Sequence, residues 1–146
     1  MLQALCVTGS PMSLKVKSKL TKYLEENQIS SVLNDTKWER LFEQLREIEE
    51  ILDFQRKDLD EPEPDESYWD GDLYHVMGEW QRIEWLNIRA LVSESKGTLL
   101  QPVVTDRTDS LIQALEKAGT PFERLKGGVR VWGYLRPGVS PRWAST

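Results

Sequence analysis

Carboxylates, aromatic rings and the one histidine of the chain gather within residues 65–75, which read Asp-Glu-Ser-Tyr-Trp-Asp-Gly-Asp-Leu-Tyr-His. Closely spaced carboxylates in a loop can hold a hard cation such as magnesium or calcium. A histidine beside a carboxylate can serve as a general acid or base. Because tryptophan and tyrosine dominate the energetics of protein interfaces, the same stretch also has the composition of a protein contact surface.

The spacing gives a metal site little support. Asp70 and Asp72 match the first two ligands of a calcium loop, but Tyr74 and Gln81 stand where further oxygen ligands belong. A zinc site would need more than one His and one Cys. We therefore expect no cofactor, and we keep a small metal-assisted enzyme as an alternative, with these ligands: Asp70, Asp72 and His75, joined by Glu66 or Glu84.

Six tryptophans are the second unusual feature. Those at positions 38, 85 and 132 lie in segments with helical or strand periodicity, so we interpret them as packing residues. Those at 69, 80 and 143 lie in polar or loop-like sequence, where a large ring has less reason to be. The residues that we predict to form an acidic-aromatic contact surface are Trp69, Asp70, Asp72, Tyr74, His75, Trp80 and Glu84.

Charge is sorted along the 146 residues, whose net charge is −5. Residues 58–86 hold ten acidic residues and one arginine, a balance of −9, whereas residues 1–24 and 124–146 hold only basic charges. The net acidity argues against a nucleic-acid-binding protein. The single cysteine excludes an intrachain disulfide, and no apolar run approaches the ~18 residues that span a bilayer. These features favour a cytoplasmic protein without membrane association.

Hydrophobic periodicity predicts the elements that must position these residues. An apolar stripe from Trp38 to Leu52 predicts a helix over 36–53, with Thr36 and Glu39 spaced as a capping box. A second helix is predicted over 106–118, ended by Gly119, and an amphipathic one over 13–33. The predicted strands are 54–59, 73–77, 83–88 and 99–104, followed by a hairpin of 122–125 and 129–135. An Asp70-Gly71 turn is predicted between the first two strands.

This order favours an α+β fold, a mostly antiparallel sheet of four to five strands with two or three helices on one face. We expect an N-terminal extension over 1–12, a single domain over 13–137 and a tail over 138–146.

Four short motifs carry a resemblance to a known family. They are Asn34-Asp35-Thr36-Lys37-Trp38, Trp69-Asp70-Gly71-Asp72, Ile83-Glu84-Trp85-Leu86, and Val131-Trp132-Gly133-Tyr134 followed by Arg136-Pro137. With them, the chain resembles a family of small uncharacterised bacterial proteins defined only as a domain of unknown function. The resemblance implies a bacterial, soluble, single-domain protein, and it implies no activity.

We therefore expect a non-enzymatic module that binds a basic protein partner through its acidic-aromatic surface. Immunity proteins that neutralise a basic toxin are one class with this character, because opposite charge speeds association. The metal-assisted enzyme is one alternative. A structural homodimer that pairs through exposed tryptophans is the other.

Overall fold

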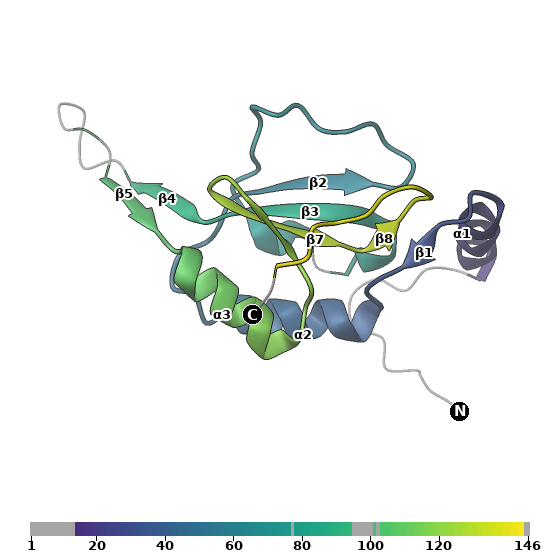
Figure 1. The fold of residues 1–146 in the computed structure, drawn as a ribbon, viewed down its shortest axis with the longest axis horizontal. Coiled ribbons are helices and arrows are strands. Elements are labelled where there is room, and N and C mark those ends of the chain that lie inside the picture. The colour runs from purple at the N-terminus through teal and green to yellow at the C-terminus, as the bar shows by residue number, and fades with distance from the viewer. Residues whose placement is uncertain (1–13, 77, 95–100, 102, 145–146) are drawn as a thin grey trace.

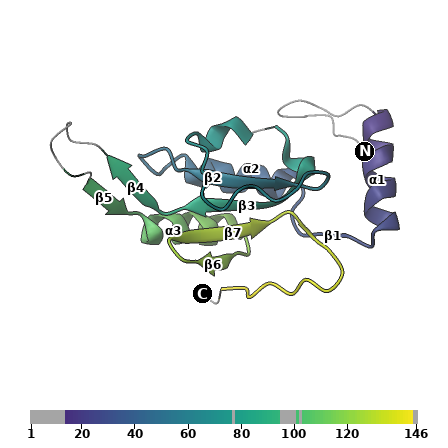
Figure 2. The same cartoon turned by 90° about the horizontal axis from the view of Figure 1, so that it is seen from above.

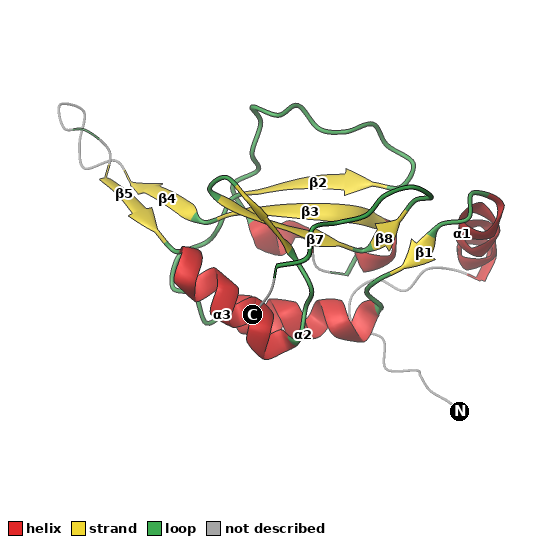
Figure 3. Cartoon of the chain, in the orientation of Figure 1, coloured by secondary structure: helices red, strands yellow, loops and turns green. Residues whose placement is uncertain are grey.

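A computed structural model describes residues 14–76, 78–94, 101 and 103–144 of the chain. Its centre is a four-stranded antiparallel sheet with the strand order β2-β3-β7-β6. Helices α2 and α3 lie side by side below one face of this sheet (Figure 1). The helices and strands, coloured by type in Figure 3, thus confirm the predicted α+β fold. The sheet strands are β2 (Phe54–Asp58), β3 (Ile83–Arg89), β6 (Glu123–Leu125) and β7 (Gly128–Trp132), and the two helices are α2 (Asp35–Leu45) and α3 (Thr108–Ala118).

Smaller elements extend from both ends of the sheet (Figure 2). At one end stands α1 (Leu14–Glu26), followed by the short β1 (Ser30–Ser31), which pairs with β8 (Tyr134–Leu135). At the other end, β4 (Leu91–Glu94) and β5 (Val103–Asp106) form a two-stranded ribbon. Within the described ranges, no helix has the length and apolarity to cross a membrane.

The two faces of the sheet differ in chemistry. Toward the helices point Leu86, Ile88 and Val131, which belong to the main hydrophobic core with α2 and α3. Side chains alternate between the faces of a strand, so the residues between them point the other way. That outer face carries polar and aromatic side chains, namely Gln55, Lys57, Trp85, Asn87, Arg130 and Trp132.

Helix α2 exists as predicted but has different ends. Its cap is Asn34, whose side-chain oxygen accepts a hydrogen bond from the Lys37 N–H at 2.9 Å, so the helix starts before the predicted capping box. It ends at Leu45 instead of residue 53, and Ile48 reaches the core from the turns that follow. The apolar periodicity therefore continues past the end of the helix.

Two predictions between β2 and β3 were wrong. Residues 73–77, predicted as a strand, contain a 3-10 helix, η1 (Leu73–Val76), and a second one, η2 (Trp80–Arg82), follows. Asp70 does not open a tight hairpin turn; it forms an isolated antiparallel bridge with Phe54. Gly71 accordingly has no left-handed backbone, which such a turn requires.

The remaining predictions are confirmed in part, since the strand predicted over 129–135 is divided into β7 and β8, and β4 has no predicted counterpart. Gly119 ends α3 in the left-handed conformation (φ 71°), and Gly127 (φ 79°) makes the turn of the β6–β7 hairpin. Of the strand predicted over 99–104, residues 103 and 104 begin β5 (Val103–Asp106), while residues 99, 100 and 102 lie outside the described residues. The segment 13–33, predicted as one helix, contains both α1 and β1.

Candidate functional site

The segment predicted to be functional forms one long loop beside β2. We call residues 59–72 the acidic loop, since it holds seven carboxylates and no basic residue. Figure 1 shows it leaving one end of β2 and arching over the strand to its other end. There, Asp70 and Phe54 exchange backbone hydrogen bonds of 2.8 and 2.9 Å. The exposed acidic and aromatic members of the loop are Asp60, Glu61, Glu63, Asp65, Glu66 and Tyr68.

One buried side chain holds the middle of this loop. The amide nitrogen of Gln55 donates to three loop carbonyls, at 3.3 Å to Asp65, 3.0 Å to Glu66 and 3.0 Å to Tyr68. The Gln55 amide oxygen in turn accepts from Asn87 at 3.0 Å, and the Asn87 oxygen accepts from Arg130 at 2.7 Å. A hydrogen-bonded chain across three strands therefore fixes the loop to the outer face of the sheet.

Hydrogen bonds within the loop also shift the pKa of two of its side chains. Asp65 accepts from both the backbone N–H and the hydroxyl of Ser67, at 2.8 and 2.7 Å, which lowers the pKa of this carboxyl. The Tyr68 hydroxyl donates to Asp70 at 2.9 Å, and this bond raises the pKa of the phenol. These bonds thus favour the ionised form of the Asp65 carboxyl and the neutral form of the exposed Tyr68 phenol.

Four more of the predicted contact residues lie at the end of the loop and beyond it. Trp69 is partly exposed, with the Arg89 guanidinium 5.7 Å from its ring centroid. Asp72 accepts from the Tyr74 N–H at 3.0 Å, and the Tyr74 ring packs edge-on against Phe42. His75 belongs to η1, and its side chain lies outside the described part of the chain.

Trp80 and Glu84 lie away from any accessible surface. Trp80 is only 4% exposed and stacks on Trp38 in the core, with ring centroids 5.8 Å apart. Glu84 is 5% exposed and accepts hydrogen bonds from Lys57 at 2.9 Å and from Arg136 at 3.1 Å. The structure therefore separates these two residues from the exposed loop with which the sequence grouped them.

The outer sheet face carries a cluster of Trp85, Arg130 and Trp132 that the sequence patterns did not predict. The Arg130 guanidinium lies 3.9 Å from the ring centroid of Trp85 and 5.4 Å from that of Trp132. Burial lowers the pKa of Arg130, and nearby carboxylates, led by Glu123, oppose that shift. The strand alternation of Arg130 and Trp132 was the available signal, but their pairing with Trp85 depends on the β3–β7 register.

Among the described side chains, no group of three or more His, Cys, Asp or Glu residues could hold a metal ion. Asp70 and Asp72 are each used locally, the first by Tyr68 and the second by the Tyr74 backbone. The described part of the loop therefore offers exposed carboxylates and no metal-binding cluster.

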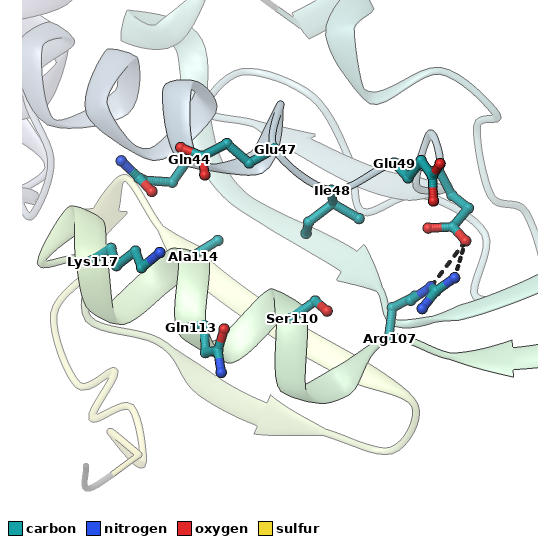
Figure 4. A pocket seen from close by; sticks show the side chains of 10 residues that line it. Gln44, Glu47, Ile48, Glu49, Arg107, Ser110, Gln113, Ala114 and Lys117 are labelled. Carbon is teal, nitrogen blue, oxygen red and sulfur yellow. Dashed lines mark hydrogen bonds and ion pairs between the residues drawn. The ribbon is translucent and has the colours of Figure 1, made fainter.

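A second concave region lies between α3 and the turns after α2 (Figure 4). This cleft has a volume of about 300 Å³, with Ile48 and Ala114 among its lining residues. Glu50 and Arg107 form an ion pair there, and the hydrogen bond from Arg107 lowers the pKa of Glu50. Because these central charges already satisfy each other, the cleft is a weaker candidate than the acidic loop, and none of the predicted contact residues lines it.

Comparison with known proteins gives a family without an assigned activity. Searches among curated proteins and among solved structures returned no match. The resemblance to a domain of unknown function is confirmed, because residues 20–138, the greater part of the chain, match one such family. The chain belongs to the family of unknown function DUF6678.

Proposed function

We propose that this protein is a non-enzymatic binding module of the bacterial cytoplasm whose acidic loop engages a basic protein partner. The observation that carries the proposal is the attachment of the loop by Gln55, which donates to three carbonyls of the loop. An exposed loop usually loses conformational entropy when a partner binds it. A loop that is already fixed loses less, so its carboxylates are presented in a geometry ready for binding.

The charge layout supports a basic partner. The acidic loop holds seven of the ten carboxylates in the stretch 58–86, and most of these seven are exposed. A concentrated charge of one sign steers a partner of opposite charge and raises its association rate. Exposed Tyr68, 59% accessible, supplies the aromatic contact that interfaces favour. Neutralisation of a toxin is one role of this kind, since an acidic surface can bind and block a basic active site.

Carbodiimide cross-linking in lysate of the native host tests where a partner binds. This reagent joins carboxylates to lysines in direct contact, so mass spectrometry of the joined peptides locates the interface on both proteins. We expect intermolecular links at Glu61, Glu63 and Glu66. Links that are spread evenly over all exposed carboxylates, or that concentrate on α2 and α3, would contradict the proposal.

A matched pair of variants then separates a specific surface from net charge. Three loop substitutions, Glu61→Gln, Glu63→Gln and Glu66→Gln, should weaken calorimetric binding of the cross-linked partner at least about tenfold, or 1.4 kcal/mol. The control removes the same charge from exposed positions elsewhere and should change binding less than about twofold. Equal weakening by both triples would show that only net charge matters. The control substitutions are Glu43→Gln, Glu47→Gln and Glu116→Gln.

A further inference from the structure

Strand β2 lies at an edge of the sheet, and only some of its backbone groups on the side away from β3 have hydrogen-bond partners. At Phe54, the outward backbone N–H and C=O are bonded to Asp70. Alternate residues of a strand direct their backbone groups to the same side, so Arg56 and Asp58 also direct theirs outward, away from β3. The Asp58 carbonyl accepts from the Glu61 N–H at 3.3 Å, which closes the other end of the strand.

Between these two closures, the edge has unused hydrogen-bonding groups. Among the residues that the structure describes, none pairs with the backbone N–H or C=O of Arg56 or with the N–H of Asp58. The acidic loop passes this stretch with Pro62 and Pro64, which have no N–H to donate. At these two positions the loop therefore has no N–H to donate to the Arg56 carbonyl.

A groove of about 450 Å³ lies between the open edge and the loop. Arg56 and Asp58 line it from β2, and Phe54 and Val76, both nearly fully buried, contribute apolar surface. Residues 61–64 of the loop line its other side. Free backbone groups beside an apolar surface are the features by which a sheet edge accepts an extended peptide.

The charge of the groove selects the kind of peptide. Its carboxylates are Asp58, Glu61, Glu63 and Asp70; among the described residues that line it, Arg56 alone is basic, and it is already paired with Asp58 at 2.6 Å. The remaining negative charge favours lysine or arginine side chains. The length of the bound peptide is limited as well, because the unpaired stretch of the edge lies between Phe54 and Asp58. This stretch has room for about three residues at roughly 3.3 Å each.

We propose that this groove binds a short extended basic segment of the partner, which adds as a strand to the β2 edge and pairs with the backbone of Arg56. This inference rests on the proposed function, and it specifies how the acidic loop and the sheet edge share one partner segment. Main-chain hydrogen bonds supply pairing to Arg56, while the loop carboxylates select basic side chains.

A synthetic tripeptide tests the pairing directly. The probe is acetyl-Lys-Val-Lys-amide, and its control is the same peptide with N-methylated backbone amides, which keeps the charge but removes the donors. With the probe at about ten times its Kd, hydrogen exchange of the Arg56 amide should slow about tenfold. No slowing at millimolar probe, or equal slowing by the N-methylated peptide, would overturn the proposal.

A pair of variants applies the same test to the cross-linked partner. Arg56→Pro removes the outward N–H at an edge position where proline is tolerated, and Arg56→Ala removes the side chain but keeps that N–H. We expect Arg56→Pro to bind the partner at least tenfold more weakly than Arg56→Ala, with circular dichroism showing that both are folded. Equal binding by the two, together with loss of binding in the loop triple, would refute strand addition and leave the acidic loop as the binding surface. Unchanged binding in all three would refute both proposals.

Discussion

Asn34 determines where α2 begins, although the sequence points equally to Thr36. Both residues precede the apolar stripe, and Thr36 also has Glu39 at the capping-box spacing. In the structure, Thr36 is already inside the helix, and Asn34 has the extended backbone (ψ 178°) and side-chain bond of a cap. Asn34, two residues before Thr36, is therefore the N-cap of α2.

This assignment gives a first prediction. Asn34→Ala should destabilise the protein by about 1 kcal/mol, because the Lys37 N–H loses its acceptor. Thr36→Ala should change stability by less than about 0.5 kcal/mol. Urea unfolding at neutral pH, followed by tryptophan fluorescence, measures both. The opposite ranking of the two variants would show that the helix starts at Thr36.

At the same scale, burial of single residues was harder to predict than position along an element. Trp38 was predicted as a core residue because helical spacing places it among leucines. Trp80 follows Gly78-Glu79, a polar context, and its stacking partner comes from a distant helix. Glu84 is buried because Lys57 and Arg136 arrive from other strands and loops to neutralise it. Such long-range pairing leaves no local pattern in the sequence.

Among the elements, the β7–β8 junction depends on a glycine for close packing. Gly133 donates to the Glu84 carbonyl at 2.8 Å, and its own carbonyl accepts from Val32 and Leu33. A Cβ atom here would lie 2.2 Å from the Ile83 carbonyl oxygen and 3.3 Å from a ring carbon of Trp38. The first clash is with backbone of the central strand, which cannot move without disturbing the sheet.

We therefore predict that Gly133→Ala destabilises the protein by at least about 2 kcal/mol, since overpacking against a fixed backbone costs this much or more. Gly71→Ala is the matched control, because a Cβ there meets no atom within 4 Å and the backbone needs no positive φ. Thermal melting of the two variants beside the parent checks the difference. A Gly133→Ala protein that melts with the parent would show that this junction is not tightly packed.

The regular elements were predictable where one face is buried along their length. The helix ended by Gly119, the hairpin at Gly127 and strands β2 and β3 were all found close to their predicted bounds. Residues 73–77 were not, because so short an apolar run shows no clear period; in the structure Leu73 and Val76 are buried three residues apart, which is the period of a 3-10 helix. The stripe from Trp38 to Leu52 overextended α2 because Ile48 and Leu52 reach the core from non-helical backbone.

Across the whole molecule, the charge sorting seen in the sequence becomes a spatial arrangement. The acidic loop lies over β2, and the basic segment after residue 124 supplies Arg130 and Arg136 to the outer sheet face. The acidic stretch could thus be found from composition alone. Its fixation by Gln55 could not, because that bond needs the β2–β3 register and the path of the loop together.

Three titratable side chains make the stability of the protein depend on pH, one of them at alkaline pH and two at acid pH. Burial raises the pKa of Tyr134 above its ordinary value, so its contribution to folding is complete below about pH 10 and is lost as pH rises through the folded pKa. Hydrogen bonds from Thr108 lower the pKa of Asp106, and those from Ser67 lower that of Asp65. The pH dependence of these two carboxyls is opposite to that of Tyr134. Their contribution to stability is complete above the pKa of the unfolded state, near 4, and is lost as pH falls through the lower pKa of the folded state.

The substitution Asp106→Ala tests how much Asp106 contributes to the loss of stability at acid pH. Asp106 accepts from the Thr108 backbone at 2.9 Å at the start of α3, so its loss should lower the melting temperature at pH 7. The gap between parent and variant should narrow below about pH 4, where the unfolded parent binds a proton that the folded parent still resists. Melting temperatures of both proteins at stepwise pH between 7 and 2.5 measure this convergence. A gap that stays constant over that range would mean that ionisation of Asp106 does not strengthen its bonds to Thr108.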